Sequence, residues 1–79
     1  MNKVDNVPVF PNLNAEMARK GYDTKALADL LGKDYRTAQS RLSGGLPFNL
    51  DEMKLIKSDW FPTKSLEYIF AKQDEIEEE

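Results

Sequence analysis

The feature that most constrains this chain is the stretch 24–45, in which two amphipathic segments are separated by one glycine and closed by a glycine pair. In the first segment, apolar residues recur at helical spacing: Ala26, Leu27, Leu30 and Leu31. Gly32 follows at a position that favours the left-handed conformation in which many helices end. Asp34 can then cap a second helix. This helix has its buried stripe at two positions four residues apart, Ala38 and Leu42. Two helices joined by a short turn that contains glycine form a helix-turn-helix motif.

The length of 79 residues and the absence of cysteine and histidine limit what else the chain can be. Such a chain forms one small domain with a limited core, and its helical periodicity predicts an all-α fold. Disulfides and thiolate metal sites are excluded, and the commonest general base and metal ligand is missing. We therefore expect no enzyme, no metal site and no cofactor. No apolar run approaches the ~20 residues of a membrane span, and the N-terminus lacks a signal-peptide pattern. These features predict a soluble cytoplasmic protein that does not bind membranes.

The charge of the chain is unevenly distributed along the sequence. The formal net charge is −3, which argues against nucleic acid as a partner, because phosphate contacts supply most non-specific affinity. Residues 19–45, however, carry six basic and three acidic side chains, whereas residues 72–79 carry one basic and five acidic ones. The positive excess therefore lies on the helix-turn-helix. Ordinary scatter of charge explains an excess of this size equally well.

The flanks of the motif predict three further helices and two terminal segments. Residues 1–11 contain two prolines and no helical period, so we expect an extended arm. Residues 12–71 form the helical domain, and residues 72–79 form an acidic tail. The helices are expected at 13–20 with Asn12 as N-cap, 24–31, 34–42, 50–58 and 66–71. Asn49, followed three residues later by Glu52, has the pattern of a capping box.

The side of the third helix that faces away from Ala38 carries polar side chains suited to base edges. We predict base contacts from Tyr35, Arg36, Gln39 and Ser40. An arginine can donate two hydrogen bonds to guanine, and a glutamine can both donate to and accept from adenine. We predict phosphate contacts from Thr24, in the first turn of the preceding helix, and from Lys33 and Arg41. A polar face that is only solvated is the alternative interpretation.

The central sequence LADLLGKDYRTAQSRLSGG resembles the Cro/phage-repressor type, or lambda repressor-like, helix-turn-helix DNA-binding family. The matching elements are Leu27-Ala28, Gly32, the cap at Asp34, Thr37 and Ser43-Gly44. The later segments NLDEMKLI and SLEYIF resemble the fourth and fifth helices of that family, so the resemblance covers about residues 12–71. The ending WFP…SLEYIF is similar to small phage or prophage regulators of Gram-positive bacteria.

This resemblance implies a compact five-helix domain that binds a pseudo-palindromic operator in double-stranded DNA as a homodimer and represses or switches transcription. It also implies roles at matching positions. Base contacts would come from Tyr35, Arg36 and Ser40, with Gln39 beside them, and phosphate contacts from Thr24, Thr37 and Ser43.

The last predicted helix carries more large apolar residues than one small core needs. Leu66, Ile69 and Phe70 are therefore candidates for a dimer interface, although closing the core of one subunit is an equally good use for them. They also define the alternative to DNA binding: an acidic helical interaction module that binds another regulator through these residues.

Overall fold

A computed structural model describes residues 9–72 of the chain, and within them every regular element is a helix. The helices are α1 (Pro11–Lys20), α2 (Thr24–Leu31), α3 (Tyr35–Ser43), α4 (Leu50–Trp60) and α5 (Leu66–Ile69). The prediction of a compact all-α domain with five helices is confirmed. Most of the predicted arm 1–11 and all but the first residue of the predicted tail 72–79 lie outside the described residues.

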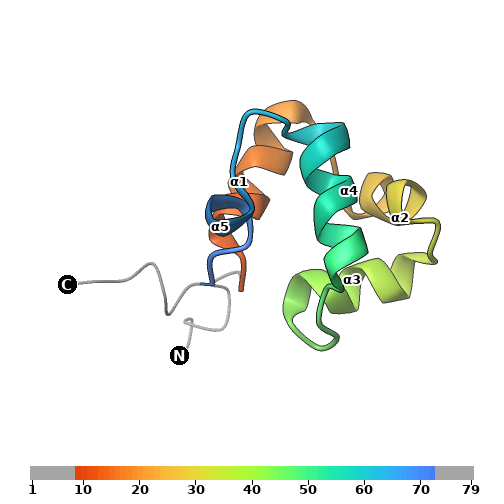
Figure 1. Ribbon diagram of the computed structural model, residues 1–79. Helices are drawn as coiled ribbons and strands as arrows, with labels where there is room; N and C mark the ends of the chain where they lie inside the picture. The colour runs from red at the N-terminus through yellow and green to blue at the C-terminus, as the bar shows by residue number, and fades with distance from the viewer. Residues whose placement is uncertain (1–8, 73–79) are drawn as a thin grey trace, which may run out of the picture.

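Helix α4 runs through the middle of the molecule (Figure 1), with α2 on one side of it and the neighbouring helices α1 and α5 on the other. α3 packs mainly against α2. No helix among residues 9–72 is long and apolar enough to cross a membrane.

Each helix contributes one side chain with no exposed surface to a shared core. These residues are Leu13 of α1, Leu27 of α2, Ala38 of α3, Ile56 of α4 and Ile69 of α5. Full burial of a leucine or isoleucine side chain contributes about 1.5–3 kcal/mol to folding. α3 contributes only an alanine of this kind, with the half-buried Leu42 packed against the core as well. Phe48, Trp60 and Phe61 are also buried, as the sequence predicts for the loop before α4 and the corner after it.

The helix ends follow the capping residues in the sequence with one exception. Asp23 accepts a hydrogen bond from Ala26 N–H at 2.9 Å, and Asp34 accepts one from Thr37 N–H at 2.8 Å. The predicted capping box at the start of α4 is present. The prediction of Asn12 as the N-cap of α1 is wrong. α1 begins at Pro11, because proline suits the first turn of a helix.

Helices α4 and α5 end at other residues than the sequence predicts. α4 continues to Trp60, two residues beyond the predicted end, and α5 stops at Ile69, two residues before it. Helical spacing from the start of α4 predicts Leu50 and Leu55 on its apolar side, but 54% and 39% of their surfaces are exposed, so this expectation is wrong.

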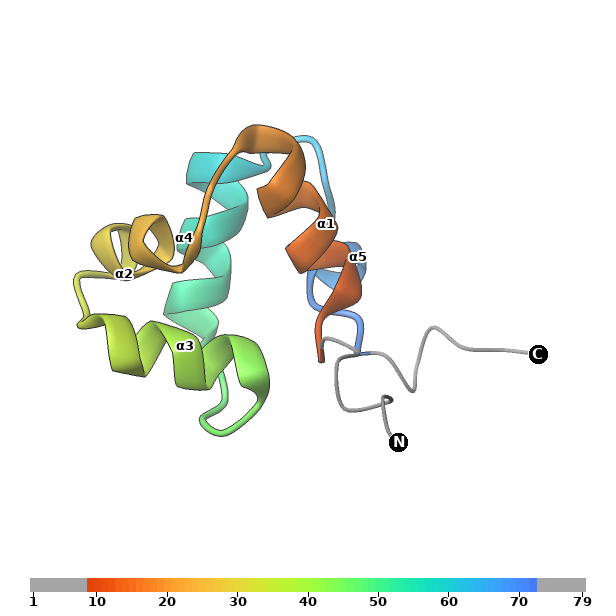
Figure 2. The ribbon, with the colours of Figure 1, turned by 180° about the vertical axis from the view of Figure 1, so that it is seen from behind.

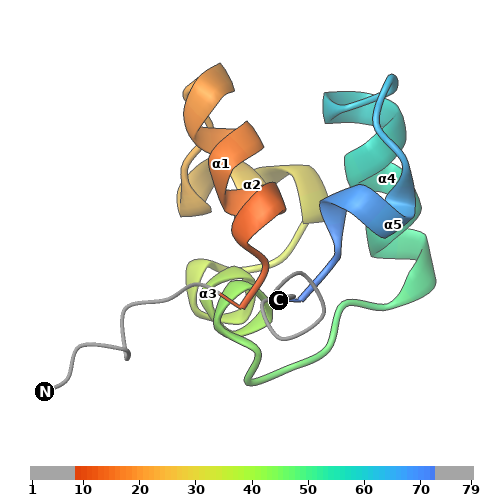
Figure 3. The same ribbon diagram turned by 90° about the vertical axis from the view of Figure 1, so that its left-hand side faces the viewer.

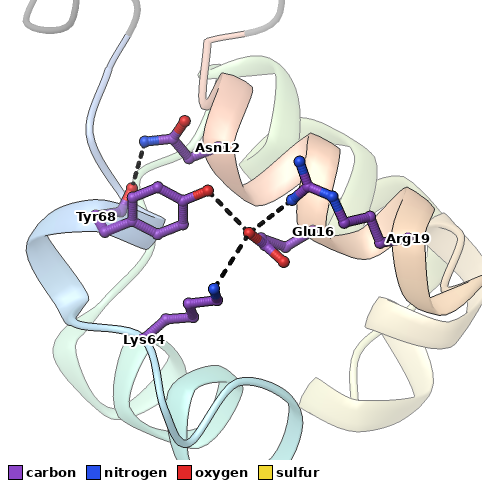
Figure 4. Close-up of polar contacts among 5 residues, drawn as sticks. All are labelled: Asn12, Glu16, Arg19, Lys64 and Tyr68. Atoms are coloured by element: carbon purple, nitrogen blue, oxygen red, sulfur yellow. Dashed lines mark hydrogen bonds and ion pairs between the residues drawn. The ribbon is translucent and has the colours of Figure 1, made fainter.

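A buried carboxylate joins α5 to α1 (Figure 4). Glu16 is only 6% exposed and accepts hydrogen bonds from the Tyr68 hydroxyl at 2.8 Å and from Arg19 at 2.7 Å, with Lys64 Nζ 3.8 Å away. The Tyr68 hydrogen bond, followed by Arg19 and Lys64, lowers the pKa of Glu16, although burial acts in the opposite direction. Asn12 adds a hydrogen bond from its side-chain amide to Tyr68 O at 2.9 Å. These contacts fix a four-residue helix that could not hold its place alone.

The chain enters the domain beside the C-terminal end of α3. The ring of Phe10 makes edge contacts with those of Phe48 and Phe70, with centroids 5.6 and 5.9 Å apart. Val9 lies against Gly44, the glycine that ends α3. This packing joins the start of the described chain to the end of α3.

Candidate nucleic-acid interface

α3 lies at the lower edge of the molecule, with no other helix beneath it in the views of Figures 1, 2 and 3. Ala38 is the only residue of α3 that is buried. The turn 32–34 that joins α2 to α3 is short because Gly32 ends α2 in the left-handed conformation and Asp34 caps α3 at once. The face of α3 opposite Ala38 is therefore exposed along the length of the helix.

Three of the four residues predicted to contact bases are exposed on α3. Tyr35 is 54% exposed, and Arg36 and Gln39 are exposed as well. Neither the Arg36 nor the Gln39 side chain makes a hydrogen bond or an ion pair with another residue in the range 9–72. Their hydrogen-bonding groups are thus free for an external partner.

Ser40 is less accessible than the sequence suggests. The chain turns back after α3, and the N–H groups of Gly45 and Leu46 both donate to Ser40 O, at 2.8 and 3.2 Å. This turn leaves Ser40 half-buried. A base contact from Ser40 would need a closer approach of DNA to the end of α3 than one from Arg36.

The first turn of α3 carries a carboxylate beside the exposed basic side chains. Hydrogen bonds from the Thr37 side chain and from Thr37 N–H hold the pKa of Asp34 below its usual value, with a further contribution from the charge of Arg36. Thr37 is half-buried and its N–H donates to Asp34 Oδ1 at 2.8 Å, so the backbone of Thr37 belongs to the cap of α3.

The other residues predicted to contact phosphate occupy the ends of α2 and α3. Thr24 is the first residue of α2 and is half-buried. Lys33 is exposed in the turn between the two helices and forms no ion pair with any described residue. Ser43 is exposed at the last position of α3, where its hydroxyl donates to Ser40 O at 3.2 Å.

Arg41 is placed differently from its predicted role in phosphate binding. Its side chain is 14% exposed and forms an ion pair with Glu52, with Nε 2.9 Å from Oε1. Its Nη1 also donates to Pro47 O at 2.7 Å. Because Nε and Nη1 of Arg41 are both engaged within the domain, we no longer propose this residue as a phosphate ligand. A signal was present in the sequence, because Arg41 lies three residues after the buried Ala38 and therefore on a neighbouring side of the helix.

The candidate dimer residues lie mostly inside the domain. Ile69 has no exposed surface, and we correct its assignment to an interface because it packs in the core of a single chain. Leu66 and Phe70 are half-buried, and Phe70 packs against the same core. The apolar excess of the last helix is thus used mainly within one subunit.

Among the described residues, no group of acidic side chains is arranged to hold a metal ion. Comparisons of the chain with family models, curated proteins and solved structures find no match. Any proposal for its function must therefore be argued from the residues and structure of the chain itself.

Proposed function

We propose that this protein is a sequence-specific DNA-binding transcriptional regulator that inserts α3 into the major groove. The observation that carries the proposal is the exposed face of α3, on which Tyr35, Arg36 and Gln39 stand at the edge of the molecule. Arg36 and Gln39 make no side-chain hydrogen bond to residues 9–72. A helix held at the surface by a partner helix and a short turn has the shape that the major groove admits.

The exposed groups match the hydrogen-bonding pattern of base pairs. The Arg36 guanidinium suits O6 and N7 of guanine, and the Gln39 amide suits N6 and N7 of adenine. A well-aligned pair of this kind contributes about 1–3 kcal/mol of discrimination against the wrong base. Tyr35 adds an aromatic ring and a hydroxyl at the start of the helix.

Phosphate contacts would come from Lys33 and from the Thr24 and Ser43 positions at the ends of the two helices. Affinity for DNA grows with the number of phosphates that a protein neutralises, since each one releases counterions. With so few cationic groups, one copy of the domain therefore binds DNA weakly. We therefore propose a homodimer on a pseudo-palindromic operator, with half-sites about one helical turn apart. This arrangement agrees with the sequence resemblance to Cro and phage repressors, and we propose that the protein acts in the cytoplasm of a bacterial host.

Selection of bound sequences from random DNA tests the proposal directly. We expect enrichment of one pseudo-palindromic sequence, and an affinity that falls steeply as salt increases. The alternative function, an acidic module that binds another regulator through an apolar surface, predicts no enriched sequence and little salt dependence.

Replacement of the central side chain then tests the assignment of α3. Arg36→Ala should weaken binding to the selected operator by about 1–3 kcal/mol and relax the preference at one base position. Lys54→Ala is the matched control, because Lys54 is an exposed cation on α4, on the side opposite the buried Ile56. An Arg36→Ala protein with unchanged affinity and unchanged base preferences would show that α3 does not read the groove.

A further inference from the structure

A buried ion pair links α3 to the start of α4 and has no part in the DNA contacts proposed above. Arg41 Nε lies 2.9 Å from Oε1 and 3.1 Å from Oε2 of Glu52. The two side chains are only 14% and 7% exposed. Both charges are therefore largely removed from water, where a charge is stable only with a well-placed partner.

The same two residues also organise the loop between the helices. Glu52 Oε1 accepts a hydrogen bond from Asn49 N–H at 3.1 Å, and Glu52 N–H donates to Asn49 Oδ1 at 2.8 Å. Arg41 Nη1 donates to Pro47 O at 2.7 Å. One guanidinium thus contacts both the middle of the loop and the cap of α4. In Figure 3 this loop runs along the lower side of the molecule from the end of α3 to α4.

α3 needs such an attachment because its own burial is slight. Its one fully buried residue is Ala38, whose small side chain restrains rotation of the helix about its axis less than a leucine would, and Leu42 is only half-buried against the core. The α2–α3 turn holds the N-terminal end of α3 through the Asp34 cap. The ion pair between Arg41 and Glu52 holds the C-terminal half of α3 to the start of α4, the next helix in the sequence.

We infer that Arg41 is a positioning residue for base recognition, and that Glu52 is the group through which it acts. The ion pair sets the rotation of α3 relative to α4, and with it the direction in which Arg36 and Gln39 meet the base edges. This inference rests on the proposed function and deepens it, since it assigns specificity to two residues that never touch DNA. A helix turned away from the base edges loses the alignment on which discrimination between bases depends.

The test compares affinity for the selected operator with affinity for random duplex DNA, over a range of salt concentrations. The variants are Arg41→Met, Glu52→Gln and the double variant, each assayed at a temperature where circular dichroism shows it folded. Arg41→Met removes a positive charge and Glu52→Gln removes a negative one, so a simple electrostatic effect would change DNA affinity in opposite directions. Lys33→Met, at the exposed lysine of the turn, is the control for a true phosphate contact.

We expect Arg41→Met and Glu52→Gln each to lower the ratio of operator affinity to random-DNA affinity by roughly tenfold. The double variant should lose no more than the larger single loss, because the two side chains act as one unit. The salt dependence should stay unchanged in all three proteins. Lys33→Met should instead weaken binding to both DNAs equally and reduce the salt slope by about 0.9.

Arg41→Lys keeps the inference testable if the methionine variant does not fold. Lysine keeps the charge but lacks the planar fork that reaches Glu52 and Pro47 O together, so the specificity ratio should fall while the salt slope is retained. A ratio unchanged in Arg41→Lys would overturn the inference. The inference would also be overturned if Arg41→Met, like Lys33→Met, weakened binding to both DNAs equally while Glu52→Gln left the specificity ratio unchanged. In that case the proposed function would survive. Absence of any DNA binding by the unmodified protein would overturn both.

Discussion

The junction between the N-terminal segment and the end of α3 makes a prediction that separates two causes of destabilisation. Gly44 ends α3 with φ 90° and ψ 3°, and a Cβ added there would lie 3.1 Å from Cγ2 of Val9. Gly32 ends α2 in the same way, with φ 69° and ψ 31°, but a Cβ there would meet nothing within 4 Å. Alanine substitutions at the two glycines therefore share backbone strain and differ in the contact with Val9.

The expected magnitudes follow from these geometries. An alanine in the left-handed region costs about 1–2 kcal/mol. The loss of glycine freedom in the unfolded chain offsets about 0.4–1 kcal/mol of that. Gly32→Ala should thus lower the free energy of unfolding by about 1 kcal/mol. Gly44→Ala adds a contact that displaces Val9, and overpacking of this kind costs about 1–3 kcal/mol more. We expect a total loss of about 2–4 kcal/mol for Gly44→Ala.

Urea unfolding followed by the fluorescence of Trp60 measures both losses. Trp60 is the single tryptophan of the chain, is 7% exposed and stacks on Tyr22 with ring centroids 4.2 Å apart, so its emission reports global unfolding. In thermal unfolding, each 1 kcal/mol should appear as a shift of about 4–8 °C.

The double variant Val9→Ala/Gly44→Ala isolates the contact. Compared with Val9→Ala alone, it should show only the backbone strain, similar to the loss for Gly32→Ala. Equal losses for Gly44→Ala and Gly32→Ala in the presence of Val9 would refute the placement of the N-terminal segment against the end of α3.

Two further predictions concern polar groups that hold the helices. Asn49→Ala removes the side-chain half of the capping box and should cost about 1 kcal/mol in urea unfolding, whereas Asn49→Asp should cost less because aspartate also caps. The depressed pKa of Glu16 means that its ionised form stabilises the fold above the ordinary pKa of a glutamate. That contribution is lost as pH falls through the lower folded value. Tyr68→Phe removes the main cause of the shift, so its stability should depend less on pH over this acidic range; an unaltered pH profile would contradict the assigned cause.

Local signals predicted most of the fold. Aspartates before helices and glycines after them act within three or four residues, and Asp34 and Gly32 occupy the predicted places. The error at Asn12 also has a local cause. Asparagine is a good cap, but Pro11 is already suited to the first helical turn, and the amide of Asn12 found a distant acceptor on Tyr68 instead.

The long-range polar contacts could not be predicted from the sequence. Glu16 and Tyr68 are 52 positions apart, and no periodic pattern relates a carboxylate on one helix to a hydroxyl on another. Arg41 and Glu52 are closer in sequence, but their pairing depends on the path of the loop that joins their helices. The exposed group of Tyr35, Arg36 and Gln39 was predictable because it needs only helical spacing from one buried alanine.

Ion pairs within the domain reduce the positive charge that the helix-turn-helix region can offer to DNA. Half of the six basic residues in 19–45 form ion pairs within the domain, namely Arg19 with Glu16, Lys25 with Asp29 and Arg41 with Glu52. A count of basic residues therefore overestimates the positive charge that reaches a phosphate. On α3 and the turn before it, Lys33 and Arg36 are the basic side chains without an ion pair to a described residue. In the proposed complex Arg36 contacts a base edge, which leaves Lys33 as the side-chain cation of this region for the DNA backbone. Non-specific affinity should then be low, and recognition should depend on the fit of α3 in the groove and on a second copy at the other half-site.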